Sequence, residues 1–144
     1  MRNDVGTAEK QLGVRLAMDG NDQEEFKFRL LQSKTLAGKV RASPFNRKDA
    51  EIIYRERWLP SVGYCLPITQ FDDKQCKAIQ MPFFNSVLPK MGFNRHFPRA
   101  VIFGPKELQG KQMKDYATYQ YTSHLIRFVG YLRQNGEMGN ILRI

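Results

Sequence analysis

The segment FDDKQCKAIQMPFFNSV, residues 71–87, predicts the central helix of a mainly α-helical fold. Asp72 and Gln75 form a capping-box pattern, in which two side chains satisfy free backbone N–H groups at the start of a helix. Apolar side chains then follow at the three- and four-residue spacing of one helix face: Cys76, Ile79, Phe83 and Val87. We expect Pro82 to kink or restart this helix, because proline removes a backbone donor.

Two more helices are predicted on the N-terminal side of this segment. Asn46 is a candidate cap for the nearer one, whose inner face carries Ala50, Ile53, Tyr54 and Trp58. The farther one is expected to begin at Asp22, with Glu25 completing a capping box, and to end by Ser43. Its predicted inner face consists of Phe26, Leu30 and Ala37, flanked by Leu36 and Val40.

Residues 11–18 alternate apolar and polar side chains, which predicts a short N-terminal strand or hairpin. The apolar positions of this alternation are Leu12, Val14, Leu16 and Met18. Residues 19–21, Asp-Gly-Asn, are typical of a turn because they tolerate positive φ. The strand should therefore be followed directly by the helix that begins at Asp22.

The C-terminal side contains a long basic loop and one more helix. Residues 89–113 have no helical period, and within them 100–103 are a candidate extended segment. Asp115 is predicted to cap a helix whose inner face is Tyr121, Leu125, Phe128, Val129 and Leu132, and which stops at Asn135-Gly136. The expected organisation is a polar tail (1–10), a single domain of four or five helices (11–135) and a C-terminal tail (136–144).

The chain has a formal net charge of +9, from 23 basic and 14 acidic residues. Such an excess repels itself in a compact protein, so it points to an anionic partner such as nucleic acid. No apolar run reaches the roughly 18–20 residues of a membrane span, and residues 1–4 lack a secretory core. We therefore expect no membrane partner and a cytoplasmic or nuclear location.

The acidic, cysteine and histidine residues do not predict a catalytic or metal site. Asp72 and Asp73 follow Phe71 as in the aromatic-x-Asp-Asp turn of polymerases, but the intervening residue is missing and helix capping explains them. A hydrolase using these two aspartates with a divalent cation remains an alternative. Cys65, Cys76, His96 and His124 are too widely spaced to form half of a metal site, so buried thiols and no cofactor are expected.

The stretch from Lys90 to Lys114 combines cations with aromatic side chains. Its basic residues are Lys90, Arg95, Arg99, Lys106, Lys111 and Lys114, and its rings are Phe93, His96, Phe97 and Phe103. Cations can follow phosphates while rings stack on bases, which suits a nucleic-acid surface. The alternative is a solvated loop whose rings tuck into the core. A second basic run consists of Lys34, Lys39, Arg41, Arg47 and Lys48.

Three segments follow one another along the chain: Leu12-Gly13-Val14, residues 34–44 (KTLAGKVRASP) and residues 58–69 (WLPSVGYCLPIT). In this order they resemble the region that follows the palm in reverse transcriptases of non-long-terminal-repeat retrotransposons. Residues 80–99, from QMPF to FPR, are similar to versions from unicellular eukaryotes, and the resemblance spans about residues 11–135. It implies a thumb and connection region without the palm, so the family's catalytic aspartates have no counterpart.

These observations predict a non-catalytic fragment that grips a template–primer or RNA–DNA duplex by its phosphates. The residues expected to make these contacts are Lys34, Lys39, Arg41, Lys90, Arg95 and Arg99. The missing palm is a possible protein partner. The alternatives are a protein-interaction module that docks through the aromatic loop 93–103, and a decayed element whose product has no activity.

Overall fold

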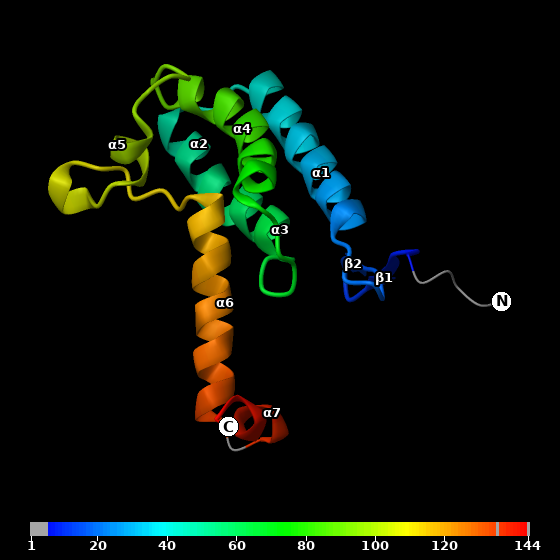
Figure 1. Ribbon diagram of the computed structural model, residues 1–144. Helices are drawn as coiled ribbons and strands as arrows, with labels where there is room; N and C mark the ends of the chain where they lie inside the picture. The colour runs from blue at the N-terminus through cyan, green and yellow to red at the C-terminus, as the bar shows by residue number, and fades with distance from the viewer. Residues whose placement is uncertain (1–5, 135, 144) are drawn as a thin grey trace.

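The structure is a computed structural model that describes residues 6–134 and 136–143. It is mainly α-helical, with a two-stranded antiparallel hairpin at the N-terminus, as the sequence predicts (Figure 1). The strands are β1 (Glu9–Gln11) and β2 (Val14–Leu16). The helices are α1 (Gln23–Ala42), α2 (Arg47–Ile53), α3 (Leu59–Gly63), α4 (Asp73–Lys90), α5 (Arg99–Phe103), α6 (Tyr116–Arg133) and α7 (Glu137–Leu142). A π-helical turn η1 (Tyr54–Trp58) joins α2 to α3, and η2 (Lys106–Leu108) is a 3₁₀ turn.

The N-terminal segment is a hairpin rather than one strand. Leu12 and Gly13 form its turn with φ values of 48° and 89°, as a two-residue turn of type I′ requires. Of the two predicted alternatives, the hairpin is confirmed, because this turn divides residues 11–18 and rules out a single strand. Val14 is buried, whereas Leu12 at the tip is 93% exposed and Met18 also faces solvent.

Helix α1 begins and ends as predicted, but the predicted capping box at its start is wrong. Asp22 makes no cap hydrogen bond, and its Oδ2 accepts one from Gln70 N at 2.8 Å. Glu25 is buried and accepts from Arg15 N and from the Arg29 side chain. Both carboxylates make tertiary contacts instead of capping the helix. The buried line along α1 consists of Glu25, Arg29, Ser33, Ala37 and Val40.

Helices α1 and α4 run parallel and form the centre of the domain (Figure 1). Ser33 Oγ donates to Ile79 O at 2.6 Å, and ten residues further along α1 the carbonyl of Ser43 accepts from Lys90 Nζ. Contacts that advance together along both helices require a parallel pair. The C-terminal ends of α1 and α4 therefore lie at the same end of the molecule.

The predicted capping residues of α2 and α4 are confirmed. Asn46 forms a capping box with Asp49, and Asp72 forms one with Gln75, whose backbone N donates to Asp72 Oδ1 at 2.6 Å. Helix α4 does not restart at Pro82 but continues through it to Lys90. The predicted stripe of α4 is buried, with Cys76, Ile79, Phe83 and Val87 all at most 1% exposed.

The aromatic core lies between α4 and the α2–η1–α3 segment. Trp58 is fully buried, and its ring stacks on Phe83 at 5.2 Å and on Tyr54 at 5.1 Å between centroids. The indole N–H donates to Ser33 Oγ, which links this core to α1. The predicted inner face of residues 46–58 is confirmed by the burial of Ala50, Tyr54 and Trp58.

The segment 100–103, predicted to be extended, forms most of the short helix α5 instead. Pro98, with φ of −54°, precedes the helix and favours its first turn, and five residues are too few to display a helical period. Residues 104–112 then fold back over α5. Lys111 N donates to Val101 O at 2.9 Å and Met113 N to Ile102 O at 3.0 Å, so these carbonyls are paired without a sheet.

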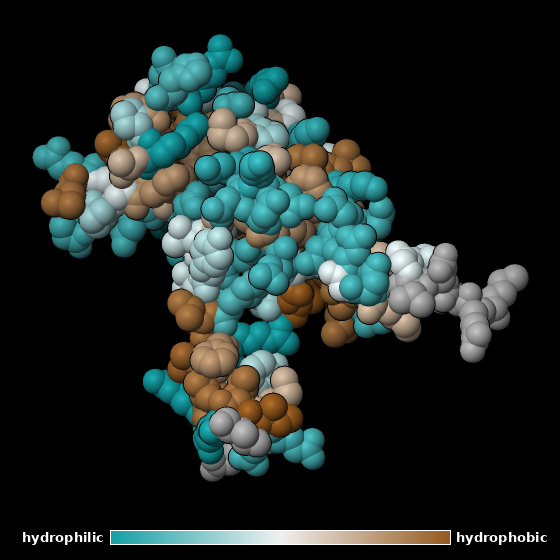
Figure 2. Space-filling model, in the orientation of Figure 1, coloured by the Kyte–Doolittle hydropathy of each residue, from teal (hydrophilic) through white to brown (hydrophobic). Residues whose placement is uncertain are grey.

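Helix α6 projects from the other helices, and α7 folds back at its far end (Figure 1). Asp115 caps α6 as predicted, accepting from Thr118 N. The predicted inner face is wrong, because four of its five residues face solvent: Tyr121, Leu125, Phe128 and Val129. Figure 2 shows the hydrophobic surface gathered on the distal part of α6 and on α7.

Tyr116 at the start of α6 packs into the core, but further along the helix the face that contacts the domain is polar. Gln120 Nε2 donates to Phe71 O at 2.9 Å, His124 Nε2 to Leu66 O at 2.7 Å and Arg127 Nη1 to Pro67 O at 2.9 Å. Nearer the base, the hydroxyl of Tyr116 donates to Val62 O. Because these acceptors are main-chain carbonyls, hydropathy periodicity alone assigns the wrong face to the interior.

Candidate nucleic-acid interface

The six predicted phosphate-binding residues do not share one surface. Arg41 and Lys90 lie at the common end of α1 and α4, where Arg41 Nη2 reaches Ser86 Oγ at 3.5 Å. Lys34 lies seven residues before Arg41, about 20° away around the helix axis, and shares its flank. Lys39 is about 140° from Lys34 and therefore faces another direction.

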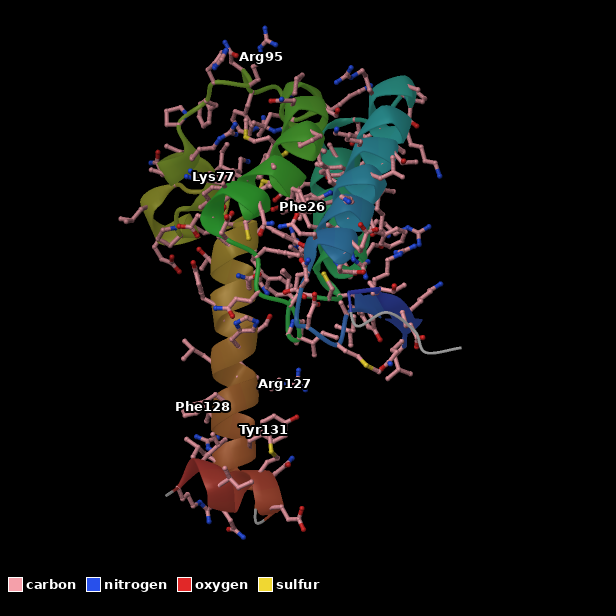
Figure 3. The ribbon with its side chains drawn as sticks, turned by 45° about the vertical axis from the view of Figure 1, so that its right-hand side comes forward. Phe26, Lys77, Arg95, Arg127, Phe128 and Tyr131 are labelled. Carbon is pink, nitrogen blue, oxygen red and sulfur yellow. The ribbon has the colours of Figure 1, made fainter. Side chains whose placement is uncertain are left out.

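Arg95 and Arg99 line a hollow of about 450 Å³ beside the end of α4, which we call the Arg95–Arg99 hollow. Met81 and Asn85 of α4 form one wall, and His96 belongs to the other. Figure 3 shows Arg95 at the end of the molecule opposite α7. Two of the six predicted cations thus line one concave surface.

The guanidinium of Arg99 is held in place but is incompletely hydrogen-bonded. Its Nη2 donates to Arg95 O at 3.1 Å, and its Cζ lies 5.1 Å from the centroid of the Phe84 ring. Its Nη1 is buried and has no hydrogen-bond partner within the described part of the chain. A buried donor without an acceptor is unfavourable, so an anion that let Arg99 turn toward the hollow would relieve it.

The phenylalanine rings of the basic loop pack against the domain, whereas His96 is exposed. Phe93 and Phe97 lie 4.6 Å apart between centroids, and Phe103 packs edge-on against Phe84. Arg47 lies 5.1 Å from the centroid of the Phe93 ring and Lys111 lies 5.6 Å from it. The alternative in which these rings tuck into the core therefore describes them better than base stacking.

Helices α1 and α4 both lie mostly within stretches of sequence that lack acidic residues. Residues 26–48 and residues 74–106 contain no Asp or Glu, and each segment carries several Lys or Arg. The parallel packing of α1 and α4 brings these two segments together. Arg47 and Lys48, exposed cations of the second basic run, follow the end of α1, and Arg47 contacts the ring of Phe93 just beyond α4. The acid-free segments were visible in the sequence, but their proximity was not.

The residues considered for catalysis or metal binding have structural roles. Asp73 Oδ1 accepts from Tyr121 OH at 2.9 Å, and Asp72 caps α4. Cys65 and Cys76 are buried free thiols, as expected. Within residues 6–134 and 136–143, no three His, Cys, Asp or Glu side chains are grouped so that they could hold a metal ion.

In the described part of the chain, no helix is both long enough and apolar enough to span a bilayer. Comparison of the chain with protein-family models, with curated proteins and with solved structures gives no match.

Proposed function

We propose that this chain is a non-catalytic module that binds double-stranded nucleic acid through its phosphates. The observation that carries the proposal is the Arg95–Arg99 hollow, whose two arginines lie in a segment, residues 74–106, that contains no Asp or Glu. Cations that no nearby carboxylate neutralises attract a polyanion, and binding then releases counterions. The contacts would be to phosphates, because Phe93, Phe97 and Phe103 pack against the core instead of standing free to stack on bases.

The resemblance to the thumb of reverse transcriptases adds the prediction that the preferred duplex is an RNA–DNA hybrid. A thumb grips the template–primer by shape and backbone contacts, which fits a surface of separate cations around a shallow hollow. On this proposal the chain acts in the cytoplasm or nucleus and depends on a palm supplied by another segment or protein.

The test is fluorescence anisotropy with a labelled RNA–DNA hybrid over a series of NaCl concentrations. We expect affinity to fall steeply with salt. In the variant Arg95→Ala/Arg99→Ala, affinity should fall and the slope of log K against log[salt] should decrease by about 2, because two phosphate contacts are lost.

Arg57→Ala/Arg133→Ala is the matched control, since it removes two exposed cations that do not line the Arg95–Arg99 hollow. This variant should keep most of the affinity of the original chain. Absence of hybrid binding at low salt, or an equal loss in both double variants, would refute the proposal.

The alternative of a protein-interaction module that docks through residues 93–103 loses support from the packing of Phe93, Phe97 and Phe103 against the core. A protein-binding role is favoured instead by the exposed apolar face of α6, which includes Leu125 and Phe128. A decayed element without activity predicts neither kind of binding, so the same anisotropy measurements distinguish it.

A further inference from the structure

A groove lies between α6 and the folded-back segment 103–114, and we call it the α6 groove. Its volume is about 950 Å³, within the range of binding pockets for small ligands and peptide segments. The α6 residues that line it extend from Thr118 to Arg127, a distance of about 14 Å at the helical rise. This length matches two to three turns of a second helix.

The rim of the α6 groove is strongly basic. Five cations line it: Arg55, Lys106, Lys111, Lys114 and Arg127. Its one acidic lining residue is Asp115, whose carboxylate accepts hydrogen bonds from the backbone N and the hydroxyl of Thr118 as the cap of α6. Lys106, Lys111 and Lys114 have no carboxylate partner within residues 6–134 and 136–143. The groove therefore favours an anionic occupant.

The wall formed by residues 104–112 is held in a defined shape. Gln112 N donates to Gly104 O at 2.9 Å, and Gly110 N donates to Pro105 O at 2.9 Å. A Cβ atom at Gly110 would overlap the carbonyl of Gly104. The backbone at these two positions therefore approaches as closely as glycine permits. Gln112, which lines the groove, has a positive φ of 52°. Main-chain hydrogen bonds thus fix this wall of the groove.

The floor of the groove is suited to aliphatic side chains rather than to nucleobases. Stacking of a base requires an open aromatic face. The ring of Tyr119 has Lys114 Nζ 5.3 Å from its centroid, and Phe103 is half-buried against Phe84. The most open apolar side chain in the groove is Ile126, which is 68% exposed.

We propose that the α6 groove binds an acidic amphipathic helix of a partner protein. The partner's apolar face would cover Ile126, and its flanking carboxylates would lie beside Lys106, Lys111 and Lys114. This mode, in which an amphipathic helix lies in a hydrophobic groove, combines apolar anchoring with charge complementarity. It is independent of the nucleic-acid surface, because the Arg95–Arg99 hollow and the α6 groove have no lining residue in common.

Fluorescence anisotropy on the full chain tests the proposal with a labelled helical peptide of about 14 residues. The peptide carries Leu at three- and four-residue spacing and Glu on both flanks of that stripe. We expect it to bind, and we expect binding to weaken at least tenfold when the sequence is scrambled or when every Glu is replaced by Gln. Oligothymidylate, a flexible polyanion, should not displace it.

Ile126→Glu and Lys106→Glu should each weaken peptide binding about tenfold, because they place a carboxylate in the groove. The matched controls are Leu31→Glu and Lys74→Glu, at exposed positions of α1 and α4, and they should bind as the original chain does. Equal binding of the scrambled peptide, displacement by oligothymidylate, or equal losses in groove and control variants would overturn the proposal. None of these outcomes tests the proposed binding of an RNA–DNA hybrid through Arg95 and Arg99, which the anisotropy measurements with the hybrid test separately.

Discussion

Glu25 and Arg29 form an ion pair inside the packed face of α1, with 2.6 Å between Glu25 Oε1 and Arg29 Nε. Neither side chain is more than 4% exposed. Arg29 also donates to Gly13 O and Ser61 O, and Glu25 Oε2 accepts from Arg15 N. This pair therefore joins the hairpin, α1 and α3 through one buried network.

Replacing one partner of this ion pair should be strongly destabilising. Arg29→Met leaves the Glu25 carboxylate buried without its cation, which lowers the free energy of unfolding by about 3–5 kcal/mol. Glu25→Leu/Arg29→Met should be less destabilised than the sum of the two single variants, because no charge is then left unpaired. Urea unfolding of the original chain, the two single variants and the double variant measures the coupling between Glu25 and Arg29. Strictly additive losses of unfolding free energy would contradict the prediction.

The hairpin turn offers a stabilising substitution. Leu12 has φ of 48°, a conformation that costs a leucine about 1 kcal/mol, whereas Asn-Gly is the preferred sequence of this turn type. Leu12→Asn should therefore raise the free energy of unfolding by about 1 kcal/mol. The side chain of Leu12 is exposed, so no core contact is lost. Thermal or urea unfolding measures the change, and Leu12→Val, which suits positive φ even less, should change stability in the opposite direction.

Gln120 fixes α6 to the segment before α4. Its side-chain amide accepts from Phe71 N at 3.1 Å and donates to Phe71 O at 2.9 Å, in a buried environment. Gln120→Leu leaves both backbone groups unpaired and should lower the free energy of unfolding by about 2–4 kcal/mol. Hydrogen exchange should show faster exchange at Phe71 N–H and along α6. Thr122→Ala on the same helix is the control, and an equal effect there would argue against this role.

The thiol of Cys76 should make stability depend on pH in the alkaline range. Burial raises the pKa of this thiol to about 12, and the nearby Asp73 and Asp115 carboxylates act in the same direction. In the unfolded chain the thiol ionises at a pH of about 8.5. The unfolded state therefore releases a proton that the folded state keeps, and the free energy of unfolding falls as pH rises from about 8.5 toward 12.

The expected slope from Cys76 is about 1.4 kcal/mol for each pH unit above that threshold. At still higher pH, Tyr54 and Tyr116 make this loss of unfolding free energy steeper, because burial raises the pKa of both phenols. Urea unfolding at several pH values measures the slope for the original chain and for Cys76→Ala. Identical slopes in the two proteins would show that the thiol does not contribute.

Local signals in the sequence predicted most helix starts. Asn46, Asp72 and Asp115 each cap the helix expected of them, because a cap depends on residues within one turn. Glu25 carries the same kind of signal, yet it binds Arg29 and Arg15 instead. Arg29, one turn further along α1, and the Arg15 backbone donor from the hairpin, ten residues away, take the place of the capping hydrogen bond.

The site was predicted less completely than the fold. Arg95 and Arg99 are close in sequence and share one hollow, so the basic loop identified them correctly as neighbours. The distance between Arg41 and this end of α4 depends on the parallel packing of α1 and α4, which no pattern in either helix reveals. The sequence did not predict the α6 groove, because its periodicity indicated that the apolar face of α6 packs inside. In the structure the polar face packs inside instead.

The attachment of α6 through main-chain carbonyls has a consequence for recognition. Apolar packing alone would allow α6 to rotate about its long axis. The directional hydrogen bonds from Gln120, His124 and Arg127 fix this rotation angle. Every copy of the protein therefore presents the same outward rows of side chains at the same orientation, and any molecule that approaches α6 meets one rigid pattern.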